Sequence, residues 1–207
     1  YEIAPIRIKK YLQAEIAFVA NKCSEEDILL DLGCGYGRVS FELLDRVNKV
    51  VGIDYSSENI NLANELNGKN KRCEFHVMNA IDLEFRNHTF DKVICVQNGI
   101  SAFKVDPVRL MYESIRVTKK GGMVLISSYS QKFWNDRLEW FELQSKEGLI
   151  GEIDYTMTRN GTIICKDGFK ATTFSKEDFL KYASNFNVKT TIHEIDNSSI
   201  FCEMIVI

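Results

Sequence analysis

Glycines and carboxylates stand at the ends of two short apolar runs of this chain, at a spacing that could hold a ribose-bearing ligand. The first run, Ile28–Leu32, contains Asp31, and the second, Val50–Ile53, leads directly to Asp54. Glycines follow the first run at alternate positions: Gly33, Gly35 and Gly37. Glycine lets the backbone take a positive φ and lets a ligand approach where a Cβ would collide. An acid about twenty residues after such a loop is presented by the neighbouring strand to the hydroxyls of a ribose.

The spacing of the glycines distinguishes two kinds of ligand. A dinucleotide fingerprint has its third glycine three positions after the second, which brings a helix N-terminus close to a pyrophosphate. Here Gly37 comes two positions after Gly35, and Arg38 follows it. This spacing disfavours a nucleotide- or dinucleotide-binding oxidoreductase. A tight strand-to-helix turn without a ligand would also use such glycines, but the acid at the next strand end favours a binding site.

The pattern Asp31-x-Gly-x-Gly-x-Gly resembles the first motif of the class I S-adenosylmethionine-dependent methyltransferases. In that family the glycine loop passes under a methionine moiety, with no phosphate. The resemblance covers most of the chain. It continues in the segment for the adenine edge, the fourth strand, and the helix, Gly-Gly turn and fifth strand that follow: residues 78–85, 90–98 and 117–126.

The resemblance implies S-adenosylmethionine as the cofactor, S-adenosylhomocysteine as the product, and no metal. Cofactor contacts are implied for the following residues: Asp31, Gly33, Gly35, Gly37, Asp54, Tyr55, Asn79, Ala80 and Gln97. We expect Asp54 on the ribose hydroxyls and Tyr55 beside the adenine. The family usually has Asp where Asn79 stands. An Asn carbonyl can still accept the bond from the adenine amino group, but without the charge.

The acceptor side is predicted where the fourth and fifth strands end. The segment 97–103 resembles the Asn-x-x-Ser segment of methyltransferases that act on glycine and related small amines, and it places Asn98 beside the transferred methyl. Tyr129 follows the fifth strand at the same edge, so we predict Asn98 and Tyr129 as the catalytic residues. Asn98 capping the following turn remains an open alternative.

A small organic acceptor is expected, with an amine as one candidate. The chain lacks the Asp/Asn-Pro-Pro-Tyr motif used on nucleobases and protein amides. It also lacks, in residues 129–131, the Arg that glycine-specific enzymes place after the fifth strand, so an amino-acid substrate is not implied. Methyl transfer from a sulfonium is an in-line displacement, and positioning alone can supply roughly 7–11 kcal/mol of the barrier. A dedicated general base is therefore optional.

Composition sets limits on partners and location. The chain has 207 residues, of which 45% are hydrophobic, and this length suits one domain, 1–207. A net charge of −3 provides no electrostatic reason to expect nucleic acid or an anionic membrane as a partner. Six cysteines without a C-x-x-C pair favour small buried thiols over zinc or disulfides. With neither a membrane-span pattern nor a signal peptide, we expect a cytoplasmic monomer or homodimer.

Strand and helix patterns alternate to about residue 128, which predicts a doubly wound α/β fold. The resemblance implies a seven-stranded, mostly parallel sheet with one antiparallel strand. Residues 129–173 interrupt the alternation as an insertion: a helix over 129–146, then a three-stranded antiparallel flap turning at Asn160-Gly161 and Asp167-Gly168. In this family such an insertion commonly covers the acceptor pocket. A dimerisation surface and a passive lid are the alternatives.

These observations predict a methyltransferase that acts on a small molecule. The alternative from another class is a noncatalytic protein that binds S-adenosylmethionine and acts as a regulator. A cofactor pocket with no opening near Asn98 would favour that alternative.

Overall fold

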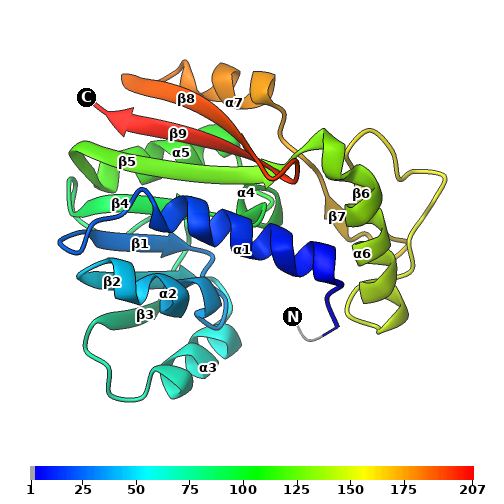
Figure 1. Ribbon diagram of the computed structural model, residues 1–207, viewed down its shortest axis with the longest axis horizontal. Coiled ribbons are helices and arrows are strands. Elements are labelled where there is room, and N and C mark those ends of the chain that lie inside the picture. The colour runs from blue at the N-terminus through cyan, green and yellow to red at the C-terminus, as the bar shows by residue number, and fades with distance from the viewer. Residues whose placement is uncertain (1–2) are drawn as a thin grey trace.

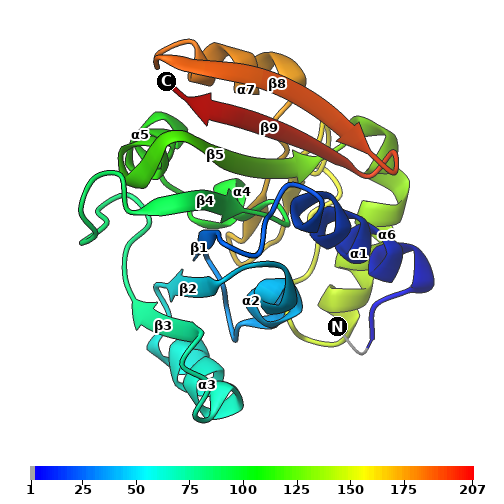
Figure 2. The same cartoon turned by 60° about the vertical axis from the view of Figure 1, so that its left-hand side comes forward.

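The computed structural model of the protein describes residues 3–207, and its main feature is one seven-stranded sheet (Figures 1 and 2). The strand order is β3-β2-β1-β4-β5-β9-β8, in which β9 runs antiparallel to both of its neighbours. The predicted fold is thereby confirmed. The strands of this sheet are β1 (Ile28–Leu32), β2 (Lys49–Asp54), β3 (Cys73–Val77), β4 (Phe90–Cys95), β5 (Thr118–Tyr129), β8 (Val188–Ile195) and β9 (Ser199–Val206).

Helices cover both faces of the sheet, and local sequence signals set where several of them begin. Asp106 caps α5 by accepting from Val108 N, with Pro107 in the first turn. Ser175 and Asp178 form a capping box at the start of α7. The helices are α1 (Ile6–Ala20), α2 (Arg38–Leu43), α3 (Ser57–Asn67), α4 (Gly99–Ala102), α5 (Pro107–Val117), α6 (Trp134–Lys146) and α7 (Lys176–Ala183), with short 3₁₀ turns η1 (Leu44–Arg46) and η2 (Gln131–Phe133).

Alternate residues of the strands face two separate apolar cores. On one face Leu30 and Val93 pack in a cluster with side chains of α5 and α7. On the other face Leu29 and Ile94 pack in a cluster with side chains of α1, α2 and α3. Because both faces are covered, the central strands are apolar almost throughout, as is typical of parallel sheets. The carboxyl ends of the parallel strands then form one shared edge.

The insertion differs in detail from its prediction. Its first residue, Tyr129, ends β5, and the helix begins only at Trp134. The flap has two strands, β6 (Ile163–Ile164) and β7 (Lys170–Ala171), instead of three. The expected third strand contributes a single bridge, from Ile153 to Cys165, because the Asp154 carboxylate accepts from Thr156 and closes a local turn.

Both predicted flap turns are present. Asn160 and Gly161 have φ values of 52° and 76°, and Gly168 has a φ of 90°. Positive φ at both residues is what a type I′ turn requires at Asn160-Gly161, whereas in Asp167-Gly168 only the glycine has a positive φ. Strands β6 and β7 are only two residues long, and they also pack against α6: Phe141 of α6 lies in one apolar cluster with Ile163 and Ala171.

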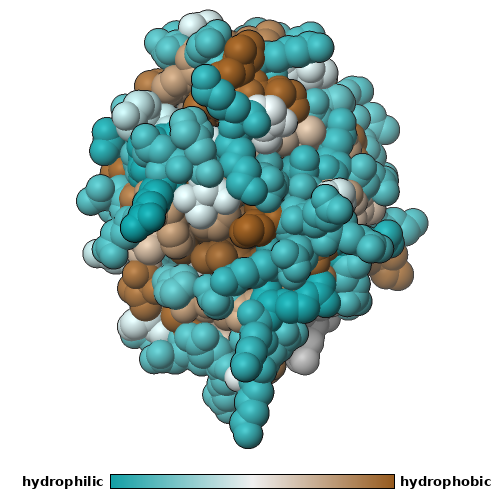
Figure 3. All heavy atoms as spheres, turned by 90° about the vertical axis from the view of Figure 1, so that its left-hand side faces the viewer, coloured by the Kyte–Doolittle hydropathy of each residue, from teal (hydrophilic) through white to brown (hydrophobic). Residues whose placement is uncertain are grey.

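The face of the molecule at the amino ends of the parallel strands is mostly hydrophilic, with apolar side chains gathered in small areas (Figure 3). Among residues 3–207, no helix combines the length and the apolar character needed to cross a membrane. All six cysteines are free, and Cys23 alone among them is not fully buried. The free thiols agree with the prediction of small buried residues.

Candidate functional site

A cavity of about 740 Å³ opens at the carboxyl ends of β1, β2 and β4. Every residue predicted to contact the cofactor lines it except Gly37. Its walls also include residues that the sequence did not single out: Cys34, Tyr36, Arg38, Val39, Ile53, Ser56, Met78, Val96, Gly99, Ala102, Phe103 and Val105. The structure thus brings the ends of three strands and the turn of α4 together around one space.

The glycine loop is tied to the end of β2 by backbone hydrogen bonds. The amides of Gly33 and Cys34 both donate to the carbonyl of Ile53, at 2.8 and 2.9 Å. The amide of Gly35 donates to Asp54 Oδ2 at 3.0 Å. The loop and the strand-end acid are therefore one hydrogen-bonded unit, and each fixes the position of the other.

A side chain at Gly35 and a side chain at Gly37 would meet different surroundings. Both have positive φ, 55° and 89°. A Cβ built on Gly35 would meet no protein atom within 4 Å, whereas one on Gly37 would lie 2.7 Å from Phe75 Cζ. Gly35 lines the cavity, so the space beside it is available to a ligand. Gly37 instead permits close packing of the loop on the aromatic ring of Phe75.

Asp54 can hold a ribose and the loop at the same time. Its Oδ2 accepts from Gly35 N, and its Oδ1 accepts from Ser56 N at 2.9 Å and from Asn59 Nδ2 at 3.4 Å. A carboxylate offers about four acceptor positions, and these three bonds leave about one for the ribose of a ligand. Tyr55 follows at the cavity wall and is 82% exposed, which leaves its ring free to lie against a flat group.

Asp31 is a buried acid at the floor of the cavity. Its Oδ2 accepts a 2.7 Å bond from Ser40 Oγ, and burial raises the pKa of its carboxyl to about 6. Burial disfavours the charged form of a carboxyl group. Asp31 therefore titrates near pH 6 at the cavity, and its bond to Ser40 also holds β1 against α2.

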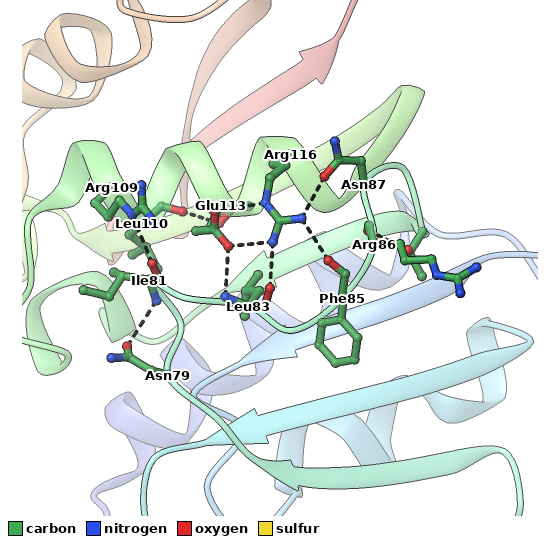
Figure 4. Close-up of polar contacts among 12 residues, drawn as sticks. Asn79, Ile81, Leu83, Phe85, Arg86, Asn87, Arg109, Leu110, Glu113 and Arg116 are labelled. Carbon is green, nitrogen blue, oxygen red and sulfur yellow. Dashed lines mark hydrogen bonds and ion pairs between the residues drawn. The ribbon is translucent and has the colours of Figure 1, made fainter.

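The segment that follows β3, residues 78–85, is held from behind by α5. Arg116 donates to the carbonyls of Leu83 and Phe85 and forms an ion pair of 2.7 Å with Glu113, whose carboxylate also accepts from Leu83 N (Figure 4). Asn79 Oδ1 accepts from Ile81 N at 3.2 Å. Glu113 and Arg116 were missed by sequence reasoning, since their partners lie 30 to 33 residues away.

Two consecutive residues after β4 are in the left-handed region: Gln97 has a φ of 56° and Asn98 of 61°. Such conformations cost free energy for residues other than glycine and gather at functional sites. Gln97 lines the cavity, and its buried Nε2 has no hydrogen-bond partner among the described residues. The carboxamide of Gln97 is thus a free donor at the cavity wall.

The two predicted catalytic residues lie behind this wall. Asn98 is 5% exposed; its Oδ1 accepts from Ser128 Oγ at 2.7 Å and its Nδ2 donates to Thr172 O at 3.0 Å. Tyr129 is buried under the Arg137 guanidinium, which lies 4.5 Å from its ring centroid. Both side chains hold the insertion against the sheet in this structure, and their catalytic role stays a prediction.

The insertion has further polar attachments. Ser101 Oγ accepts from Thr172 N at 2.9 Å, and Ser128 Oγ accepts from Phe174 N at 2.8 Å. The buried Arg137 donates to the carbonyls of Gly161 and Ala171, at 2.7 and 2.9 Å. The flap is thereby fastened both to the ends of β4 and β5 and to α6.

Within residues 3–207, His, Cys, Asp and Glu side chains do not gather in a group that could hold a metal ion. The absence of a metal in the active protein stays a prediction.

Comparison with known proteins finds a family model that matches part of the chain, related methyltransferases, and solved structures with the same fold. Residues 29–122 match the family described as "Methyltransferase domain". The chain is 29% identical over 133 residues to 2-methyl-6-phytyl-1,4-hydroquinone methyltransferase of Synechocystis sp., covering 60% of this chain and 41% of that protein. It is 36% identical over 113 residues to the chloroplastic 2-phytyl-1,4-beta-naphthoquinone methyltransferase of Arabidopsis thaliana, covering 51% of this chain and 42% of that protein. The chain spans about two fifths of the length of these two relatives.

A solved structure of a SAM-dependent methyltransferase from Methanosarcina mazei has the same fold. Its TM-score is 0.67 at 23% sequence identity, and the match covers 92% of this chain and 97% of that one. The agreement extends over nearly the whole chain and shows that the two chains share a fold.

Proposed function

We propose, from the match of residues 29–122 to the family described as "Methyltransferase domain" and from the related methyltransferases, that the chain is a class I S-adenosylmethionine-dependent methyltransferase and transfers a methyl group to a small organic acceptor. One observation carries the proposal: the open space beside the Gly35 Cα, next to a strand-end acid with unused acceptor capacity. Both features belong to a site built for a ribose-bearing ligand that approaches the backbone closely.

The residues of the cavity have separate roles in this proposal. Asp54 accepts from the ribose hydroxyls, Tyr55 and Asn79 lie at the adenine, and Gly33 and Gly35 leave room for the methionine moiety. Asp31 and Gln97 line the part of the cavity where β1 and β4 end. When bound, the cofactor supplies an electrophilic methyl on a sulfonium. The chain positions the two reactants and excludes water, an effect worth roughly 7–11 kcal/mol in well-aligned systems.

The insertion, residues 129–173, is proposed to cover the acceptor. Support comes from its attachments at Asn98, Ser101 and Ser128, which follow or end the strands beside the cavity. Local opening of such polar attachments would admit an acceptor, and closure would exclude water from the reaction. An amine is the first acceptor to test, because the segment 97–103 resembles that of small-amine methyltransferases.

The test has two stages. Titration calorimetry with S-adenosylhomocysteine measures whether the cavity binds the product, and we expect saturable binding with one site per chain. Turnover is then measured as release of S-adenosylhomocysteine from S-adenosylmethionine in the presence of a panel of small amines, phenols and hydroquinones. Release that depends on one acceptor supports the proposal. Failure to bind either the cofactor or its product would overturn it.

The position of Asn98 favours a second candidate function, a noncatalytic regulator that binds S-adenosylmethionine. Asn98 does not line the cavity, and both ends of its carboxamide are already bonded within the chain. A regulator that only binds the cofactor would need no opening on that side. Tight binding of S-adenosylmethionine with no acceptor-dependent release across the panel would favour this alternative.

A further inference from the structure

An acidic residue stands in the buried face of α1, where the pattern calls for an apolar one. The face is formed by Ile8, Tyr11, Ile16 and Val19, and Glu15 lies among them with no exposed surface. Acidic side chains are almost never fully buried unless they are paired. Among residues 3–207 the groups that act on the Glu15 carboxylate are neutral donors, and none of them is basic.

Three elements that are distant in sequence donate to this carboxylate. Glu15 Oε2 accepts from Gln97 N at 2.6 Å and from Ser127 Oγ of β5 at 3.0 Å. Glu15 Oε1 accepts from Ser199 Oγ of β9. The carboxylate therefore joins α1 to the carboxyl ends of β4 and β5 and to the start of β9, at the edge where the cavity lies.

The bond to Gln97 acts directly on the cavity wall. Gln97 is held in the left-handed region, which is unfavourable for a residue with a side chain, and its unpartnered Nε2 is buried at the cavity. A bond from a backbone amide to a carboxylate is roughly twice as strong as one to a neutral acceptor. Glu15 can thus supply the interaction that keeps Gln97 in this strained conformation.

We propose that Glu15 is a positioning residue of the cofactor site: through its bond to the Gln97 amide it holds the left-handed turn after β4, so that the Gln97 carboxamide faces the ligand. The inference rests on the proposed function only for the identity of the ligand. The bond between Glu15 and Gln97, and its effect on the shape of the cavity wall, are independent of any turnover.

Protonation of Glu15 provides a way to weaken this bond without removing the side chain. Burial raises the pKa of Glu15 to about 7. The titratable groups that face it are Tyr11 from its own helix, Cys95 from β4 and Tyr129 from β5, each with a pKa raised by burial, so all three are neutral near pH 7. Beyond Tyr129 lies the Arg137 guanidinium of α6. Near neutral pH, Glu15 is thus the group of this cluster that changes its charge.

The first experiment needs no ligand. Nuclear magnetic resonance of the uniformly ¹⁵N-labelled chain follows the backbone amide of Gln97 between pH 5.5 and 8.5. We expect its shift to titrate near pH 7 in the wild type and to be flat in Glu15→Gln, which keeps the size of the side chain. A Gln97 amide that titrates equally in both proteins overturns the inference.

The second experiment measures S-adenosylhomocysteine affinity by calorimetry over the same pH range. The wild type should bind several-fold more tightly at pH 8 than at pH 6, because the ionised carboxylate is the stronger acceptor. Glu15→Gln should show a much smaller pH dependence and an affinity close to that of the wild type at low pH. The contribution of Asp31, whose pKa is raised to about 6, is common to both proteins and cancels in the comparison.

Controls separate positioning from a merely structural role. Glu65→Gln changes an exposed acid on α3 and should leave the pH profile of the affinity unchanged. If Glu15→Gln lowers the melting temperature but keeps the wild-type pH profile, Glu15 is only structural and the inference fails. If the wild type binds no S-adenosylhomocysteine at any pH, the proposed function fails, while the Gln97 titration still decides whether Glu15 holds the turn.

Discussion

Gly35→Ala should separate ligand binding from folding, because the added methyl would point into the cavity and away from the protein. The backbone at Gly35 has a φ of 55°, where a residue with a Cβ is strained. No protein atom lies within 4 Å of the position that the Cβ would take. The substitution should therefore lower the stability of the fold through backbone strain and, separately, lower the affinity for the ligand through the added methyl group.

Both effects can be stated as magnitudes. A left-handed conformation costs roughly 1–2 kcal/mol for a residue other than glycine. In a chain of this size that corresponds to a fall in the melting temperature of roughly 2–8 °C. If the methyl displaces the ligand enough to lose one hydrogen bond to the loop or to Asp54, the affinity falls by about 10- to 100-fold.

The assay is calorimetry with S-adenosylhomocysteine together with thermal unfolding. Gly121→Ala is the matched control, since Gly121 has a φ of 75°, its Cβ would also meet nothing within 4 Å, and it does not line the cavity. The two variants should lose similar stability, and only Gly35→Ala should lose affinity. A folded Gly35→Ala protein that binds S-adenosylhomocysteine as tightly as the wild type would refute the assignment of the loop.

Three further predictions follow from single contacts. Asp54→Ala should raise the dissociation constant for S-adenosylhomocysteine by about 10²-fold, since roughly 3 kcal/mol of charge-assisted bonds is lost; calorimetry checks this, with the exposed Asp45→Ala as a control whose affinity stays unchanged. Asn98→Ala should increase proteolytic cleavage within residues 150–170, because it removes bonds to Ser128 and Thr172 that fasten the flap; equal cleavage rates would contradict this role. Burial raises the pKa of Glu15 from 4.5 to about 7, so between these pH values the folded protein keeps a proton that the unfolded chain loses. The free energy of unfolding of the wild type should therefore fall as the pH rises from 4.5 to about 7. Denaturant unfolding should show that Glu15→Gln gains stability relative to the wild type as the pH rises from 5 to 8, and a constant difference would argue against it.

The sequence alone predicts those parts of the protein that depend on local patterns. The glycine loop, the acid at the end of β2 and the alternation of apolar runs are each contained within a few consecutive residues. The alternation of strands and helices predicts a doubly wound α/β fold. The family resemblance carried by the glycine loop and the later segments implies the seven-stranded sheet and the loops that line the cavity. The turns at Asn160-Gly161 and Asp167-Gly168 were predictable because each is a local pattern of consecutive residues.

Side-chain contacts between distant segments could not be predicted in this way. The bonds from Asn98 to Thr172, from Gln97 to Glu15 and from Ser199 to Glu15 span 74, 82 and 184 positions. No periodicity within a helix or strand records such pairs. The sequence therefore predicts Asn98 at the acceptor, a role that stays a prediction, but does not predict the bond of its carboxamide to Thr172 of the flap.

For Glu15, too, the sequence shows the position in the helix, while the tertiary structure decides the environment of the side chain. Its position in the apolar face of α1 is visible in the sequence, but an acid there could also mark the edge of that face. Only the packing of α1 over the ends of β4, β5 and β9 removes its carboxylate from water and supplies the neutral donors. Local sequence therefore determines the strands, turns and cofactor loop, and tertiary packing decides which polar side chains are buried, because burial depends on every element that surrounds a group.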